Sequence, residues 1–196
     1  MRVSLIVVLI LPLVSFAQPA SVQTCVACHG ARGEGNPTNG YPRIAGQPRE
    51  YLRRQLEAYV DGRRENPVMA PIAKQLTPEQ RSELAAYYSR QSPPPAKDAA
   101  RPANTQRGQT LATAGDESLR VQACQNCHGP GGTGFGNLVP YLAGLDAKYL
   151  AAALQEWRDG KRKTDSSQQM TQIAKALTDA DTKAVAAYYA SQQPPK

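Results

Sequence analysis

The chain has 196 residues and a formal net charge of +7, with 41% hydrophobic, 20% charged and only 6% aromatic residues. Four Cys in a chain of this length are too few for a small disulfide-rich scaffold. Lys and Arg are scattered among carboxylates without forming a basic stripe, so the charge does not indicate binding to nucleic acid. The low aromatic content indicates that a group other than side chains helps to fill the core.

The first seventeen residues are typical of a secretory signal peptide. Arg2 precedes an apolar run from Val3 to Val14, which Pro12 interrupts, and a small-x-small motif ends at Ala17. The run is shorter than the roughly 20 residues that a membrane-spanning helix needs. We expect cleavage after Ala17, which leaves a soluble mature chain in the periplasm, an oxidising compartment.

Two helices are predicted in the first half of the mature chain. An apolar-periodic stretch opens at Pro48 and stops at Gly62, as expected of a capped helix. Thr77 to Gln80 form a capping box that leads into a second helix.

Residues 92–104 separate the two halves and carry four prolines without apolar periodicity, which predicts a semi-rigid linker. In the second half, a helix is expected between Asp146 and Gly160, and Thr178 to Asp181 repeats the capping box imperfectly. No segment shows sustained period-two alternation, so each half is expected to be a small all-α domain with long loops.

The two halves repeat each other in order, which indicates a tandem duplication. The matched pairs include Cys25–Gly30 with Cys124–Gly129, Tyr51 with Tyr149, Gly62 with Gly160, and Met69 with Met170. The two members of a pair lie 98 to 101 residues apart, so the loops differ in length between the halves while the matched residues keep their order. The predicted domains span residues 18–91 and 105–196.

All four Cys and both His belong to two copies of Cys-x-x-Cys-His. The copies are Cys25, Cys28 and His29 in the first half and Cys124, Cys127 and His128 in the second. This pentapeptide is typical of covalent c-type haem attachment, because its spacing lets both sulfurs reach the vinyl groups on one porphyrin edge. A zinc site would lack one ligand, and a thioredoxin-like redox pair would lack its βαβ context. We therefore expect two covalently bound haems.

The mature chain has two Met, Met69 and Met170, one in each half. Because no His is left over, a thioether is the expected sixth ligand of each iron, and His/Met ligation raises the reduction potential. The alternative is that both Met fill gaps in the core.

These motifs resemble the cytochrome c4 family, whose members join two class I cytochrome c domains. The resemblance covers the whole mature chain and rests on Cys-x-x-Cys-His-Gly, a Pro-x-hydrophobic-Ala-Gly segment and a distal Met in each half. It implies covalent attachment of haem to the four Cys, with His29 and His128 as proximal and Met69 and Met170 as distal ligands. It also implies that the carbonyls of Pro42 and Pro140 accept the proximal imidazole N–H groups.

The first half departs from the family pattern at its N-terminus. Only seven residues, Gln18 to Thr24, precede Cys25, whereas Gln106 to Ala123 precede the second motif. The family's N-terminal helix is therefore expected to be missing or vestigial in the first domain, and the haem there to be more exposed.

Some aromatic and basic residues have weaker assignments. Tyr59 and Trp157 are expected to pack on haem or in the core, and the paired Tyr at 87–88 and 188–189 to be mostly core. Arg43, Arg63, Arg64 and residues 161–163 are candidates for facing haem propionates or a partner, but we expect them to be solvated charges.

The function that the resemblance implies is a periplasmic single-electron carrier of a respiratory chain, which donates towards a terminal oxidase and is not an enzyme. Redox proteins are the expected partners, and peripheral membrane association stays open. One alternative is a cytochrome subunit bound permanently to a dehydrogenase. Another is a diheme enzyme such as a thiosulfate dehydrogenase, which usually needs a Cys ligand, a second His or a vacant iron position.

Overall fold

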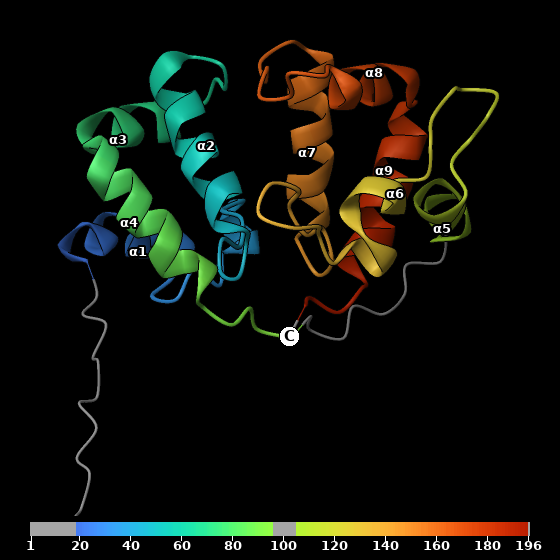
Figure 1. The fold of residues 1–196 in the computed structure, drawn as a ribbon. Coiled ribbons are helices and arrows are strands. Elements are labelled where there is room, and N and C mark those ends of the chain that lie inside the picture. The colour runs from blue at the N-terminus through green and yellow to red at the C-terminus, as the bar shows by residue number, and fades with distance from the viewer. Residues whose placement is uncertain (1–18, 96–104, 196) are drawn as a thin grey trace, which may run out of the picture.

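The computed structural model describes residues 19–95 and 105–195 and shows two groups of helices (Figure 1). The predicted signal peptide and most of the predicted linker lie outside these residues. Within the described ranges there is no β-strand, only isolated bridges, so the all-α prediction is confirmed. No helix in these ranges is long and apolar enough to cross a membrane.

The first domain contains both helices that the local signals predict, together with shorter elements that the sequence analysis did not name. Its elements are η1 (Ala20–Val22), α1 (Gln23–His29), η2 (Pro37–Asn39), α2 (Arg49–Asp61), α3 (Met69–Gln75) and α4 (Pro78–Ser89). Helix α2 ends at Gly62, whose φ of +79° is a left-handed conformation that glycine adopts without strain. The Thr77 hydroxyl accepts from the Gln80 N–H at 3.2 Å, and the Gln80 side chain accepts from the Thr77 N–H at 2.9 Å. The predicted capping box is therefore present at the start of α4.

The second domain repeats this arrangement and adds a helix at its start. Its elements are α5 (Thr105–Thr113), α6 (Gln125–His128), η3 (Pro130–Gly132), α7 (Ala147–Arg158), α8 (Gln169–Ala176) and α9 (Asp179–Ala190). The Asp146 carboxylate caps α7 by accepting from the Tyr149 N–H at 3.1 Å. The capping box of α9 is more complete than the sequence suggested, because Asp181 accepts from the Thr178 N–H and donates its own N–H to the Thr178 hydroxyl, each at 3.1 Å.

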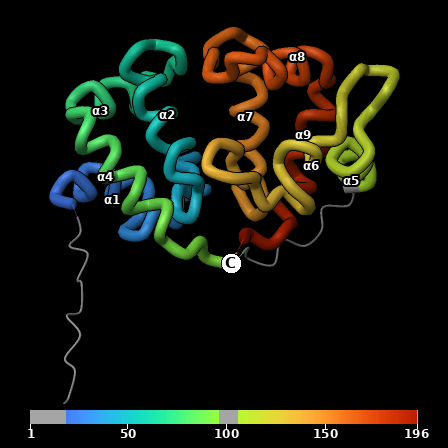
Figure 2. Tube along the Cα trace, viewed as in Figure 1, coloured from blue at the N-terminus to red at the C-terminus, as the bar shows by residue number. Residues whose placement is uncertain are grey.

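Helix α5 packs closely against α9, and Figure 2 shows α5 at the outer end of the second domain, on the same side of α7 as α9. A Cβ at Gly108 of α5 would lie only 2.1 Å from the carbonyl oxygen of Ala184 in α9, so the glycine allows this close approach. In the first domain, the described residues before Cys25 form only η1 and the first residues of α1, and η1 contacts α4. The predicted difference between the two N-terminal segments is therefore confirmed for the described residues.

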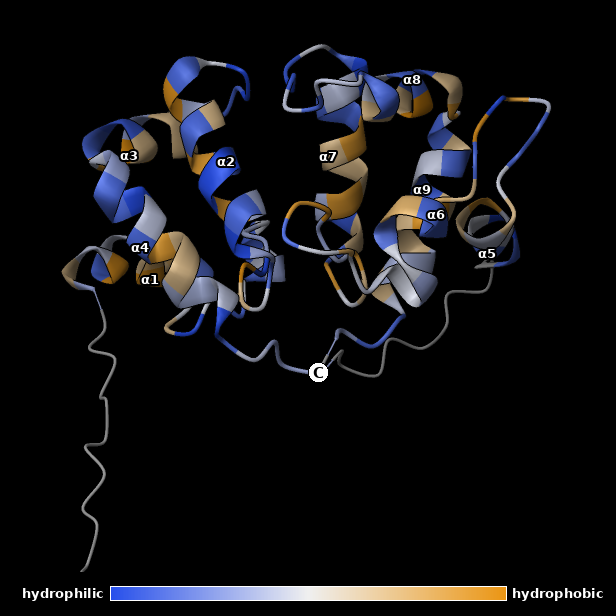
Figure 3. Cartoon of the chain, viewed as in Figure 1, coloured by the Kyte–Doolittle hydropathy of each residue, from blue (hydrophilic) through white to orange (hydrophobic). Residues whose placement is uncertain are grey.

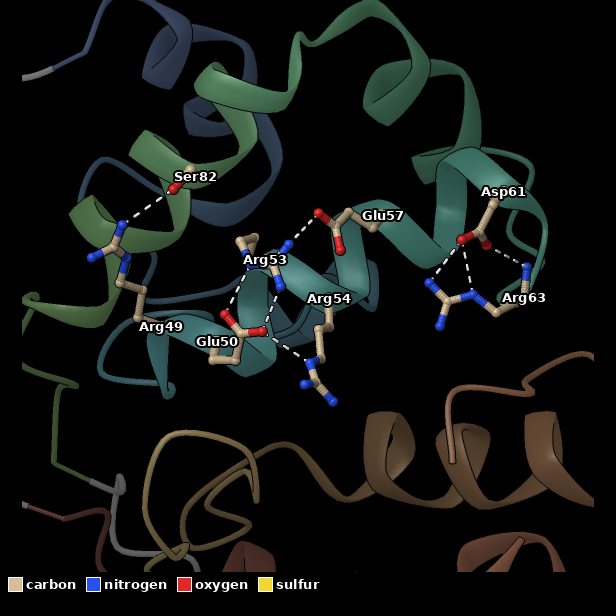
Figure 4. A network of polar contacts seen from close by, with 8 residues as sticks. All are labelled: Arg49, Glu50, Arg53, Arg54, Glu57, Asp61, Arg63 and Ser82. Atoms are coloured by element: carbon tan, nitrogen blue, oxygen red, sulfur yellow. Dashed lines mark hydrogen bonds and ion pairs between the residues drawn. The ribbon is translucent and has the colours of Figure 1, made fainter. Parts of the chain in front are cut away.

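The two central helices differ in polarity. Helix α7 shows long hydrophobic stretches in Figure 3, whereas α2 is largely hydrophilic on the side drawn there. Helix α2 carries a chain of ion pairs, in which Glu50 contacts Arg53 and Arg54 and Glu57 contacts Arg53 (Figure 4). These side chains are about one-third exposed or more, so such pairs contribute little to stability.

The two domains contact each other directly through buried polar groups and backbone. The Tyr141 hydroxyl donates to the Ala45 carbonyl at 2.6 Å, and the Gln47 amide donates to the Tyr141 carbonyl at 3.0 Å. The loops after α2 and α7 pair as antiparallel backbone at Arg64 and Arg162. Specific hydrogen bonds therefore hold the two domains against each other.

Candidate functional site

The four side chains that the sequence assigns to the first haem surround one cavity. The cavity has a volume of about 420 Å³, and its lining includes Cys25, Cys28, His29 and Met69. The two Cys and the His lie on α1, while Met69 begins α3, which places the thioether on a separate helix. Apolar side chains such as Leu52 line the rest, as expected of a site for a large apolar ligand.

His29 is held in the tautomer that an iron ligand needs. Its Nδ1 lies 2.8 Å from the Pro42 carbonyl oxygen. Because a carbonyl only accepts, Nδ1 carries the proton and the lone pair of Nε2 stays free. Burial lowers the pKa of His29, which keeps the imidazole neutral.

The second domain repeats this geometry. Nδ1 of His128 lies 2.9 Å from the Pro140 carbonyl oxygen, and burial lowers the pKa of His128. The predicted role of both prolines as acceptors for the proximal imidazoles is therefore confirmed.

The backbone of each candidate distal Met is held by a polar side chain of the preceding loop. The Met69 N–H donates to Asn66 Oδ1 at 2.9 Å, and the Met170 N–H donates to the Asp165 carboxylate. Each Met lies in the first two residues of a short helix, α3 or α8. These contacts hold the Met backbone at the start of each short helix.

The four Cys form no disulfide with one another. Burial raises the pKa of Cys25 and Cys124, the first Cys of each motif. Cys127, the second Cys of the second motif, is exposed at the surface.

The polar atoms around the first cavity fit a ligand that carries carboxylates. Arg43 lines the cavity, and its buried Nε and Nη1 have no hydrogen-bond partner. A buried donor without an acceptor is costly, and a haem propionate oxygen would satisfy it. The apolar lining, the paired Cys, the neutral His and the orphaned guanidinium all fit a covalently bound haem.

Two of the basic residues expected to be solvated are buried at the domain junction. Arg64 and Arg162 are 4% and 2% exposed, whereas Arg63 and Lys161 are exposed as expected. The expectation was wrong for the buried pair because the antiparallel contact between the two loops encloses both side chains. Nothing local in either half marks that contact.

Each buried guanidinium lies over an aromatic ring of its own domain. The Cζ atom of Arg64 lies 5.0 Å from the Tyr59 ring centroid, and that of Arg162 lies 3.8 Å from the Trp157 ring centroid. Such cation–π contacts offset part of the cost of desolvating a guanidinium.

Residues of the second domain also line the first cavity, which the sequence analysis missed. They are Lys148, Tyr149, Ala152 and Glu156, all on α7. When each half is treated as a self-contained repeat, nothing indicates that residues of the second domain line the cavity of the first. The available signal was Glu156, a carboxylate where the other copy has Ala58.

Comparisons with known proteins agree with this site. The family model described as cytochrome c matches residues 18–90 and again residues 105–193. A thiosulfate dehydrogenase electron acceptor from Thiomonas intermedia is 44% identical over 178 residues, which cover 90% of this chain and 82% of that protein. Cytochrome c4 from Pseudomonas aeruginosa is 32% identical over 174 residues, which cover 88% of this chain and 85% of that protein.

Two solved structures share the fold over most of the chain. Reduced recombinant cytochrome c4 from Pseudomonas stutzeri has a TM-score of 0.79 and 30% identity, and the match covers 87% of this chain and 94% of that one. The thiosulfate dehydrogenase TsdBA from Marichromatium purpuratum has a TM-score of 0.78 and 39% identity over 86% of this chain, which spans only 36% of that longer chain. With both motifs, both histidine geometries and these matches, the chain belongs to the cytochrome c family as a cytochrome c4-like protein with two covalently bound haems.

Proposed function

We propose that this chain is a periplasmic electron carrier in which each haem iron has one His and one Met ligand. The proposed ligand pairs are His29 with Met69, and His128 with Met170. When bound, each haem supplies a one-electron couple, and His/Met ligation favours the reduced iron. The protein's part is to fix the two ligands, exclude water and hold the two haem sites together through the domain junction.

The observation that carries this proposal is the convergence on one cavity of both Cys, His29 and Met69 from separate helices. A core Met would not need to share a cavity with the whole Cys-x-x-Cys-His motif. The chain has no further His or Cys beyond the two motifs, so the proposed thioethers fill the only open iron positions that the motifs leave. An electron carrier needs no such open position, whereas a haem enzyme generally does.

For the electron donor, we propose an enzyme that oxidises thiosulfate. Proteins named as thiosulfate dehydrogenase electron acceptors, from Thiomonas intermedia and from Stutzerimonas stutzeri, are 44% and 40% identical to this chain. The carrier would then pass the electrons towards a respiratory acceptor such as a terminal oxidase.

An anaerobic reduction assay tests the donor. The oxidised diheme protein is mixed with a purified thiosulfate dehydrogenase, and thiosulfate is added. We expect full reduction of both haems, seen as the rise of the sharp absorption band of ferrous haem. Protein with thiosulfate alone should stay oxidised, and reduction in that control would instead favour a diheme enzyme. If the complete mixture also stays oxidised, the proposed donor is wrong.

A permanent subunit of a dehydrogenase is the second candidate. It is favoured by the match of this chain to 36% of a longer thiosulfate dehydrogenase chain, since that match places a similar pair of domains within the longer chain. Purification from the native host separates the candidates, because a free carrier elutes at its own mass and a subunit elutes with a catalytic chain.

A further inference from the structure

The junction between the domains contains a buried cluster of charges. The Arg64 and Arg162 side chains are 4% and 2% exposed, and Glu156 is 20% exposed. Arg64 Nε donates to Glu156 Oε2 at 2.9 Å, and Arg162 Nη1 lies 3.9 Å from the same oxygen. The Gln55 side-chain oxygen accepts from Arg64 Nη1 at 3.0 Å and from Arg162 Nη2 at 2.9 Å. A single carboxylate therefore serves two buried guanidinium groups.

The cluster is asymmetric although the domains are repeats. Arg64 and Arg162 occupy equivalent positions, because each follows the glycine that ends its helix pattern by two residues. The position of Glu156 in the second domain corresponds to Ala58 in the first, and Ala58 is fully buried. Among the residues that the structure describes, only the second domain therefore supplies a carboxylate to the cluster.

This carboxylate faces the haem site of the other domain. Glu156 lies on α7 of the second domain, yet it lines the first cavity, as do Arg64 and Met69. Arg162 instead lies over Trp157 of its own domain. The anion thus lies at the first haem site, where it pairs with Arg64.

We propose that Glu156 tunes the haem of the first domain from across the junction and lowers its reduction potential. A nearby negative charge stabilises the ferric iron, which carries one more positive charge than the ferrous iron. Because the carboxylate is largely shielded from water, salt screens this effect less than that of a surface charge. The inference rests on the electron-carrier function proposed above.

The test is a redox titration of the diheme protein carrying Glu156→Gln. This variant removes the charge but keeps an oxygen that accepts from Arg64, so the junction stays closed. Met69→Ala and Met170→Ala assign the two redox waves to their domains. We expect the wave of the first domain to move to higher potential, with at least a threefold rise in the reduced-to-oxidised ratio at a fixed potential. The wave of the second domain should move less.

A matched control is Glu57→Gln. Glu57 lies on α2 and pairs with Arg53 (Figure 4), and its side chain is 32% exposed and lies outside the described lining of the first cavity. This variant should leave both waves in place. If Glu57→Gln and Glu156→Gln move the waves equally, the effect is one of overall charge and the proposal is wrong.

Arg64→Gln separates tuning by charge from loosening of the junction. Loss of this cation should move the wave of the first domain to lower potential, opposite to Glu156→Gln. A purely structural role would move both variants in the same direction, because each would admit water to the site. Shifts in the same direction, or an unmoved wave in Glu156→Gln, overturn the proposal. The near-infrared sulfur-to-iron band is recorded for the unmodified protein, and its absence there would overturn the proposed Met ligation instead.

Discussion

The packing of α5 on α9 leads to a quantitative prediction for Gly108→Ala. The added methyl carbon would lie 2.1 Å from the Ala184 carbonyl oxygen, 2.6 Å from the Ala184 carbonyl carbon and 2.9 Å from the Tyr188 Cβ. Since ordinary contacts to carbon begin at about 3.5 Å, the helices must separate by roughly 1.4 Å at this point. Overpacking of this kind costs about 1–3 kcal/mol, and the opposing backbone atoms cannot rotate away, which favours the upper end of that range.

The substitution also brings a gain that opposes this cost. Alanine is about 1 kcal/mol better than glycine in a helix interior. We therefore expect a net loss of about 2 kcal/mol in the free energy of unfolding of the second domain. Gln109→Ala is the matched control, because Gln109 is the next residue of α5 and is exposed. That control should change the free energy of unfolding by less than about 0.5 kcal/mol.

Urea denaturation followed by tryptophan fluorescence measures this loss in the second domain alone. Trp157 is the only Trp of the chain and lies on α7, so its emission reports the second domain. The haem quenches the emission in the folded state, and unfolding restores it. An unchanged or raised urea midpoint in Gly108→Ala would refute the reasoning, because it would mean that α5 and α9 lie further apart in solution than in this structure.

The other predictions concern the haems. Mass spectrometry of the mature, denatured chain should show two added haem masses, and a bare polypeptide from a host able to attach haem would contradict the cofactor assignment. Met69→Ala and Met170→Ala should each remove about half of the near-infrared sulfur-to-iron band and lower the potential of one haem, whereas an unchanged band would make that Met a core residue. The haem of the first domain should have the lower potential, because it lacks a covering helix such as α5 and faces Glu156. Redox titration of the two Met variants assigns the waves, and a higher wave in the first domain would contradict this order.

Local sequence alone determined the two longest helices of each half, the duplication and the two haem motifs. Helix starts such as Thr77 and Asp146 are predictable because a cap bonds to a backbone group only a few residues away. The Cys-x-x-Cys-His motif is equally local, since one turn of helix holds it. The prediction of Met69 as the second ligand rests on different grounds, because the repeat and the absence of other His residues leave few candidates.

Only the tertiary structure decided the environment of the charged residues at the junction. Arg64 and Glu156 are 92 positions apart in the chain, and each looks like an ordinary solvated charge in its own half. They meet, and Arg64 is buried, because two loops of different domains pair through their backbones, a contact without any local pattern. The residues of α7 that line the first cavity are likewise brought there by the contact between the two domains. The burial and the electrostatic environment of a side chain depend on which surfaces of the two domains meet. The sequence of one repeat, read without the other, does not show which surfaces these are.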